Sequence, residues 1–149
     1  MKPSAAPSGS PDVIVVGEAL IDVVLSPAGA AEHPGGSPAN VAYGLARLGV
    51  STGFLTAIGQ DDRGNAIRTH LAGAGVELLP GSQSMPATST ATATLADDGS
   101  ASYTFDLTWQ LPPVAPTYLP KLLHTGSIAS FLAPGATGVK CILQHCAGI

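Results

Sequence analysis

The chain has 149 residues, which is about the length of one domain. Hydrophobic residues make up 45% of it and charged residues only 11%, which excludes a disordered protein and predicts a packed core. The net charge is -4 and the six Lys and Arg residues are scattered, so no basic face is available to bind nucleic acid.

The N-terminal residues 1–12 are rich in Pro, Ser and Ala and lack an apolar signal-peptide core, so we expect a disordered tail. The apolar runs at residues 13–16 and 20–25 are far shorter than the roughly 20 residues needed to cross a bilayer. The spacing of Cys141 and Cys146 matches no common metal site, and both are expected to be reduced thiols. These features predict a cytoplasmic protein with no membrane partner and no protein-bound metal.

A β-branched run at residues 13–16 predicts a buried strand of a parallel sheet. Residues 18–25 are expected to continue in an extended conformation, and residues 27–34 to form a loop or a short edge strand. Ser37 is expected to cap the helix that follows, and Gly49 to end it. The residues expected on its inward face are Val41, Leu45 and Leu48.

Residues 52–58 predict a second buried strand. Asp61 or Asp62 can then cap a second helix that ends near Gly73, with Ile67 and Leu71 facing inward, and residues 76–79 form a third strand. Strands and helices alternate, which predicts an α/β sandwich with right-handed crossovers.

The alternation of strands and helices stops at about residue 88. Residues 88–106 alternate in polarity around an Asp97-Asp98-Gly99 turn, which predicts a β-hairpin outside the main sheet. Ala101, Tyr103 and Phe105 would share one face of its second strand. Residues 122–126 return to a buried strand, and a helix begins near Pro134.

The run from Gly35 to Asn40, GGSPAN, predicts a glycine turn that opens a helix. Two glycines let a ligand approach the backbone, and the first N–H groups of a helix can donate to hydroxyls. An Asn side chain both donates and accepts, as a sugar hydroxyl does. From these residues alone, an ordinary strand–turn–helix junction fits equally well.

Residues 35–59, GGSPANVAYGLARLGVSTGFLTAIG, resemble the N-terminal signature of the PfkB, or ribokinase-like, family of sugar kinases. The segments VIVVGEALIDVV, GQDDRG and LLHTGSIA are also similar to family segments, so the resemblance covers roughly residues 13–138. Within the family it looks most like the fructokinases. The resemblance implies a Rossmann-like α/β/α sandwich whose N-terminal part is residues 13–149. A small β-sheet lid would come from residues 18–33 and 88–106.

The resemblance also implies roles for single residues. Asp22 would accept hydrogen bonds from two sugar hydroxyls, and Gly35 and Gly36 would bring the backbone to the sugar. Asn40 would bind further hydroxyls, and Phe105 would close over the sugar ring. The plainer readings stay open: an exposed charge for Asp22, a structural turn for the glycines, a helix cap for Asn40 and hairpin packing for Phe105.

Phosphoryl transfer also needs a base, donors for the phosphate and a cation. In this family the base is an Asp in a Gly-Ala-Gly-Asp segment, and ATP and Mg²⁺ bind near it. The sequence holds no such segment, since Gly135-Ala136-Thr137-Gly138 carries no Asp. We therefore expect a sugar-binding half with no catalytic residue, with the nucleotide-binding half absent.

The resemblance fades at residues 139–149, VKCILQHCAGI, which suggests a cut or shifted reading frame. The alternative function is an inactive fragment that acts only in sugar binding or dimerisation, with a homodimer forming through the lid. The sugar stays open among fructose, ribose, a sugar acid and a nucleoside.

Overall fold

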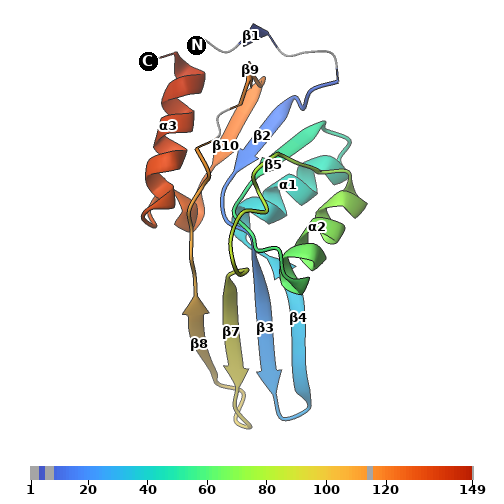
Figure 1. Ribbon diagram of the computed structural model, residues 1–149. Helices are drawn as coiled ribbons and strands as arrows, with labels where there is room; N and C mark the ends of the chain where they lie inside the picture. The colour runs from blue at the N-terminus through green and yellow to red at the C-terminus, as the bar shows by residue number, and fades with distance from the viewer. Residues whose placement is uncertain (1–3, 6–8, 114–115, 149) are drawn as a thin grey trace.

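The structure is a computed structural model that describes residues 4–5, 9–113 and 116–148 (Figure 1). The strands are β1 (Ser4–Ala5), β2 (Val13–Val16), β3 (Leu20–Ser26), β4 (Gly29–Gly35), β5 (Thr52–Leu55), β6 (Glu77–Leu78), β7 (Thr90–Leu95), β8 (Ala101–Asp106), β9 (Tyr118–Leu119) and β10 (Leu122–Thr125). The helices are α1 (Ser37–Arg47), α2 (Asp62–Ala74) and α3 (Gly135–Ala147), with a short 3₁₀ helix η1 (Ser127–Ser130).

The strands β10, β2, β5 and β6, in that order, form a parallel sheet that we call the central sheet. Every residue of β2 is buried, because alternate side chains point into two separate cores. Val13 and Val15 pack in the core with α1 and α2, and Ile14 and Val16 in the core with α3. Helices therefore cover both faces, as Figure 1 shows, and the predicted α/β/α architecture is confirmed.

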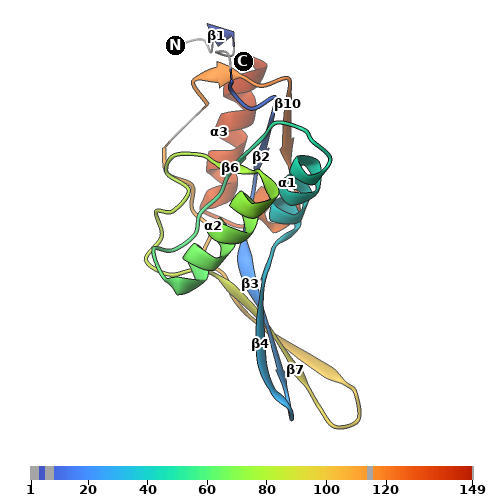
Figure 2. The same cartoon turned by 90° about the vertical axis from the view of Figure 1, so that its right-hand side faces the viewer.

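A second sheet, which we call the outer sheet, has the strand order β4-β3-β7-β8. The β3–β4 and β7–β8 pairs are antiparallel hairpins, and β3 and β7 run parallel at the centre. The predicted hairpin at residues 88–106 is therefore present, and residues 29–35 are an edge strand. Figure 2 shows the outer sheet extending away from the central sheet and the helices.

Helix α1 differs from the prediction at its start and on its inward face, while Gly49, with φ of 84°, follows its end as predicted. Its N-cap is Gly36 and not Ser37, and no side chain caps it. Gly36 has φ of 102°, a left-handed conformation that favours glycine. Leu48 lies just beyond the helix and is 83% exposed, so it does not face the core. The fully buried residues are small and bring α1 close to the sheet: Pro38, Ala39 and Ala42. The predicted Val41 and Leu45 are partly buried and pack against the same core.

Helix α2 begins as predicted, with Asp61 as its N-cap and Ile67 and Leu71 buried. It ends at Ala74, followed by Gly75 with φ of 92°, and not at Gly73.

Two strand predictions need correction. The strand β5 stops at Leu55, although residues 56–58 stay buried. The strand β10, expected to be buried, is the edge of the central sheet, and its Leu122 is 52% exposed.

Half of the predicted disordered tail, residues 1–3 and 6–8, lies outside the described residues. In the other half, Ser4–Ala5 pairs in parallel with Tyr118–Leu119, and Pro11 is buried. Among the described residues, none of the helices has the length and apolar character that a membrane crossing requires.

Candidate functional site

The central and outer sheets meet where β2 ends and β3 begins. The connection from β2 to β5 contains α1, which covers one face of the central sheet. The segment after β10 contains α3, which covers the opposite face. In such sheets ligands bind beyond the carboxyl ends of the strands at this switch in direction. Glu18 lies there, 8% exposed, and its Oε2 accepts a hydrogen bond of 2.9 Å from the Ala129 N–H. This bond ties the end of β2 to η1.

The strand pair β3–β4 brings Asp22 and Gly35 together. Leu20 pairs with Gly35, and Asp22 pairs with His33. Because side chains alternate along a strand, Asp22 and Gly35 share one face of the outer sheet. A β-carbon on Gly35 would overlap the Asp22 carboxylate. The glycine therefore makes room for the carboxylate at the start of the turn.

Gly36 makes an equally close approach to the preceding strand connection. A β-carbon there would lie 2.8 Å from the Glu18 carbonyl oxygen and 3.1 Å from the Ala19 α-carbon. The Gly36 carbonyl accepts from the Asn40 N–H at 2.9 Å, which forms the first turn of α1. The Asn40 side chain is exposed, and within the described residues no hydrogen bond occupies its amide.

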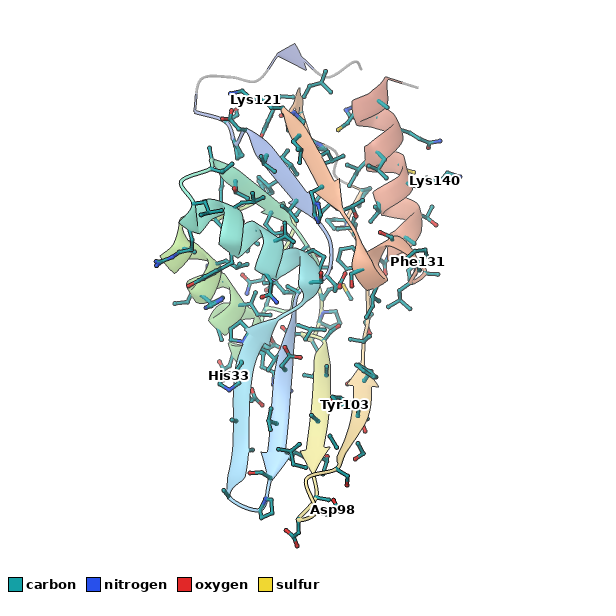
Figure 3. All side chains as sticks on the ribbon, turned by 180° about the vertical axis from the view of Figure 1, so that it is seen from behind. His33, Asp98, Tyr103, Lys121, Phe131 and Lys140 are labelled. Atoms are coloured by element: carbon teal, nitrogen blue, oxygen red, sulfur yellow. The ribbon has the colours of Figure 1, made fainter. Side chains whose placement is uncertain are left out.

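Phe105 lies in the same cross-strand row as Asp22. Asp22 pairs with Ala91 on β7, and Ala91 pairs with Phe105 on β8. All three side chains thus share one face. The small Ala91 lies between Asp22 and Phe105, which are two strand spacings, or about 10 Å, apart. Phe105 is 60% exposed and stacks on Tyr103, with ring centroids 6.5 Å apart. Figure 3 shows Tyr103 on the strand at the edge of the outer sheet.

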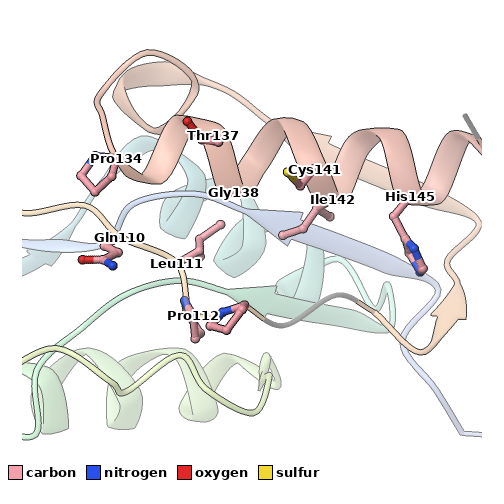
Figure 4. Close-up of a pocket in the computed structure, with 10 residues that line it drawn as sticks. Gln110, Leu111, Pro112, Pro134, Thr137, Gly138, Cys141, Ile142 and His145 are labelled. Carbon is pink, nitrogen blue, oxygen red and sulfur yellow. The ribbon is translucent and has the colours of Figure 1, made fainter. Parts of the chain in front are cut away.

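A cavity of about 680 Å³ lies away from this row, between α3 and residues 110–113 (Figure 4). Cys141 and His145 are in its wall, but none of the five candidate residues is. A second cavity, of about 210 Å³, is lined by apolar groups such as Ile14 and Leu79. Asp22, Asn40 and Phe105 are thus exposed groups on an open surface and not the walls of these cavities.

Sequence reasoning missed two links between α2 and the outer sheet. Asp61 holds Thr88 by hydrogen bonds, and Arg63 forms an ion pair with Glu32. The glycines that flank this turn, Gly59 and Gly64, were the available signal. Among residues 4–5, 9–113 and 116–148, no three His, Cys, Asp or Glu side chains lie close enough to hold a metal ion.

Residues 10–112 match the family model described as pfkB family carbohydrate kinase. The chain therefore belongs to the PfkB family of carbohydrate kinases, as its sequence motifs predicted. A fructokinase from Klebsiella pneumoniae is 35% identical over 141 residues, covering 87% of this chain and 45% of the relative. A fructokinase from Escherichia coli is 39% identical over 98 residues, covering 64% of this chain and 32% of the relative.

Solved structures agree on the fold. The apo fructokinase from Vibrio cholerae O395 has a TM-score of 0.81 and 25% identity, covering 93% of this chain and 50% of that one. A fructokinase from Xylella fastidiosa with bound ATP has a TM-score of 0.69 and 23% identity, covering 93% of this chain and 49% of that one. The chain thus spans about half or less of the length of the relatives it matches.

Proposed function

We propose that this chain provides the sugar-binding part of an ATP-dependent sugar kinase of the fructokinase type. The observation that carries the proposal is the contact between the Asp22 carboxylate and Gly35, at the start of the glycine turn that opens α1. The similarity to fructokinases supports the substrate class.

Each candidate residue has a chemical role in this proposal. The Asp22 carboxylate accepts hydrogen bonds from two sugar hydroxyls. Gly35 and Gly36 form the turn beside the sugar, and their lack of side chains lets this turn pack against Asp22 and the Glu18–Ala19 backbone. The exposed Asn40 amide binds further hydroxyls from the start of α1. Phe105, in the row with Asp22, covers the apolar face of the sugar ring, and the outer sheet acts as the lid.

In the whole enzyme ATP would supply the γ-phosphoryl group for a primary hydroxyl of the sugar, with Mg²⁺ balancing the phosphate charge. The described residues offer no acidic cluster for Mg²⁺, and the sequence contains no Gly-Ala-Gly-Asp segment. We therefore assign neither the base nor the nucleotide site to this chain, and no reaction step to its residues.

A second candidate is sugar binding without turnover, with a homodimer formed through the outer sheet. The exposed rings of Tyr103 and Phe105, which stack on each other on the edge strand of the outer sheet, favour it. The free thiols of Cys141 and Cys146 suit a cytoplasmic setting for either function.

Calorimetric titration of the purified chain with fructose, then with ribose, tests the binding role. Asp22→Asn should weaken fructose binding about 10- to 100-fold, because a hydrogen bond to a charged group contributes about 1.5–3 kcal/mol. The control Asp97→Asn lies in the far loop of the same sheet and should bind as the parent does. Equal affinity in the parent and Asp22→Asn would overturn the assignment. Release of ADP from ATP with fructose present distinguishes the two candidate functions.

A further inference from the structure

Asp61 does more than cap α2, because its carboxylate also binds the segment that leads into β7. Its Oδ1 accepts from the Thr88 hydroxyl at 2.6 Å and from the Gly64 N–H at 2.8 Å. Its Oδ2 accepts from the Thr88 N–H at 2.9 Å. The Thr88 hydroxyl oxygen in turn accepts from the Gly59 N–H at 3.0 Å, and Thr88 is only 7% exposed. One carboxylate thus joins the start of α2 to the base of the outer sheet.

Two glycines bring these segments into direct backbone contact. A β-carbon on Gly59 would lie 2.7 Å from the Thr88 nitrogen, and one on Gly64 would lie 3.0 Å from the Thr88 Oγ1. The first distance is too short for a β-carbon and the second is tighter than most real contacts, and a β-carbon on Gly64 would also overlap the Gly59 carbonyl oxygen. No side chain therefore separates the Thr88 backbone from the turn before α2. A displacement of Thr88 would require the turn to shift with it.

Strand pairing connects Thr88 to Asp22. Ser89 follows Thr88, and its carbonyl accepts from the Ile21 N–H at 3.0 Å. Ile21 pairs with Thr90 and immediately precedes Asp22. The contact at Asp61 is therefore one strand pair away from the candidate sugar ligand.

The first turn of α2 also contacts β4, the second strand that pairs with β3. Arg63 Nε donates to Glu32 Oε2 on β4 at 3.1 Å, and the second Arg63 nitrogen pairs with Glu32 Oε1. The two side chains are 43% and 42% exposed, so water and salt compete with this ion pair. Figures 1 and 2 both show α2 beside the end of the outer sheet nearest the central sheet.

We propose that the first turn of α2 sets the orientation of the outer sheet, with Asp61–Thr88 as the fixed contact and Arg63–Glu32 as the releasable one. Asp61 is then a positioning residue for Asp22, acting through Thr88 and Ser89. The expected effect on sugar binding rests on the proposed function. The Asp61–Thr88 contact, which we call the anchor, can be measured without any sugar.

The competing explanation is that Asp61 only caps α2. Thr88→Val separates the two, because it leaves the Asp61–Gly64 bond intact and removes both hydrogen bonds of the Thr88 hydroxyl. Thr88→Ser is the matched rescue, since it keeps the hydroxyl. Asp62→Ala is the control for α2 itself, because Asp62 is exposed in the same turn.

The experiment measures the distance between two spin labels, one on the exposed Leu48 just beyond α1 and one on Asp97 at the tip of the outer sheet. Cys141 and Cys146 are first replaced by Ser. The distance distribution should broaden in Thr88→Val and return to the parent's in Thr88→Ser. It should stay unchanged in Asp62→Ala. High salt should broaden the parent's distribution, because salt weakens the Arg63–Glu32 ion pair. Arg63→Met should have the broad distribution already at low salt, and added salt should not change it further.

Calorimetry with fructose is the second readout. Thr88→Val should weaken binding about 2- to 30-fold, the range found for residues that act through a network, and Thr88→Ser should restore it. A distance distribution in Thr88→Val equal to the parent's would overturn the anchor. Failure of the parent to bind fructose would instead overturn the proposed function, while the distance measurement would still decide the anchor.

Discussion

The carboxylate of Asp22 occupies the space beside the Gly35 α-carbon in which any other residue would have its β-carbon. The two residues come from different strands of the outer sheet and share one face. The Gly35 backbone is not in the left-handed region, so the glycine is required for space and not for its dihedral angles. This separates its role from that of Gly36, which has φ of 102°.

Gly35→Ala should therefore displace Asp22 without straining the backbone. We expect fructose binding to weaken about 10- to 100-fold, as for loss of a charged hydrogen-bond acceptor. The control Gly44→Ala adds a methyl group to open space on α1 and should stabilise the helix by about 0.5–1 kcal/mol. Calorimetry and urea unfolding measure the two effects. Unchanged sugar affinity in Gly35→Ala would contradict the role given to Asp22.

Asp61 should make stability depend on pH in the acid range. Burial opposes its ionisation, but hydrogen bonds from Thr88 and Gly64 outweigh burial and hold its pKa below the ordinary value of 3.8. The native state thus favours the ionised form. The stabilisation is present above pH about 4 and is lost as pH falls through the lowered pKa.

Urea unfolding of the parent and of Asp61→Asn across that range tests this dependence. The difference in unfolding free energy should be largest near neutral pH and shrink in acid. Glu32, hydrogen-bonded to Arg63, and Asp98, hydrogen-bonded to Ser100, also have lowered pKa values and affect both proteins equally. A difference that stays constant with pH would show that Asp61 acts without its charge.

Glu18 should matter for stability, because it is the buried acceptor for the Ala129 N–H. Glu18→Ala leaves that N–H without a partner, and we expect a loss of about 1–3 kcal/mol in the free energy of unfolding. Glu18→Gln keeps an acceptor oxygen and should lose less. The exposed Glu77 is the comparison, since Glu77→Ala should stay within about 0.5 kcal/mol of the parent. Equal losses at both positions would count against the buried link.

Trp109 should report on the packing of α3. It is the single tryptophan, it is 3% exposed, and its Nε1 donates to the Ala129 carbonyl at 3.0 Å. A β-carbon on Gly135 would overlap its ring. Gly135→Ala should therefore shift the fluorescence to longer wavelength and destabilise the fold by about 1–3 kcal/mol. Gly73→Ala, which meets open space on α2, should leave the emission unchanged.

Much of the fold could be predicted because it follows from local patterns. A short β-branched run such as residues 13–16 favours a strand that is covered on both faces. Asp61 as a cap and the helical spacing of Ile67 and Leu71 indicate α2. The prediction for the cap of α1 is wrong because Ser37 has a side chain typical of an N-cap but is already the first residue of the helix. Gly36 is the N-cap, with a φ of 102° that favours glycine. Leu48 has helical spacing but lies past the helix end.

By itself, the sequence determined the order of strands and helices, the glycine turn and the family to which the chain belongs. Only the tertiary structure decided that β3 lies between β4 and β7, which sets Asp22 against Gly35 and in line with Phe105. It alone joined Asp61 to Thr88, residues 27 positions apart in the chain. The physical reason is that helix and strand preferences act over a few neighbouring residues. Strand partners and register depend on how the whole chain buries its apolar faces.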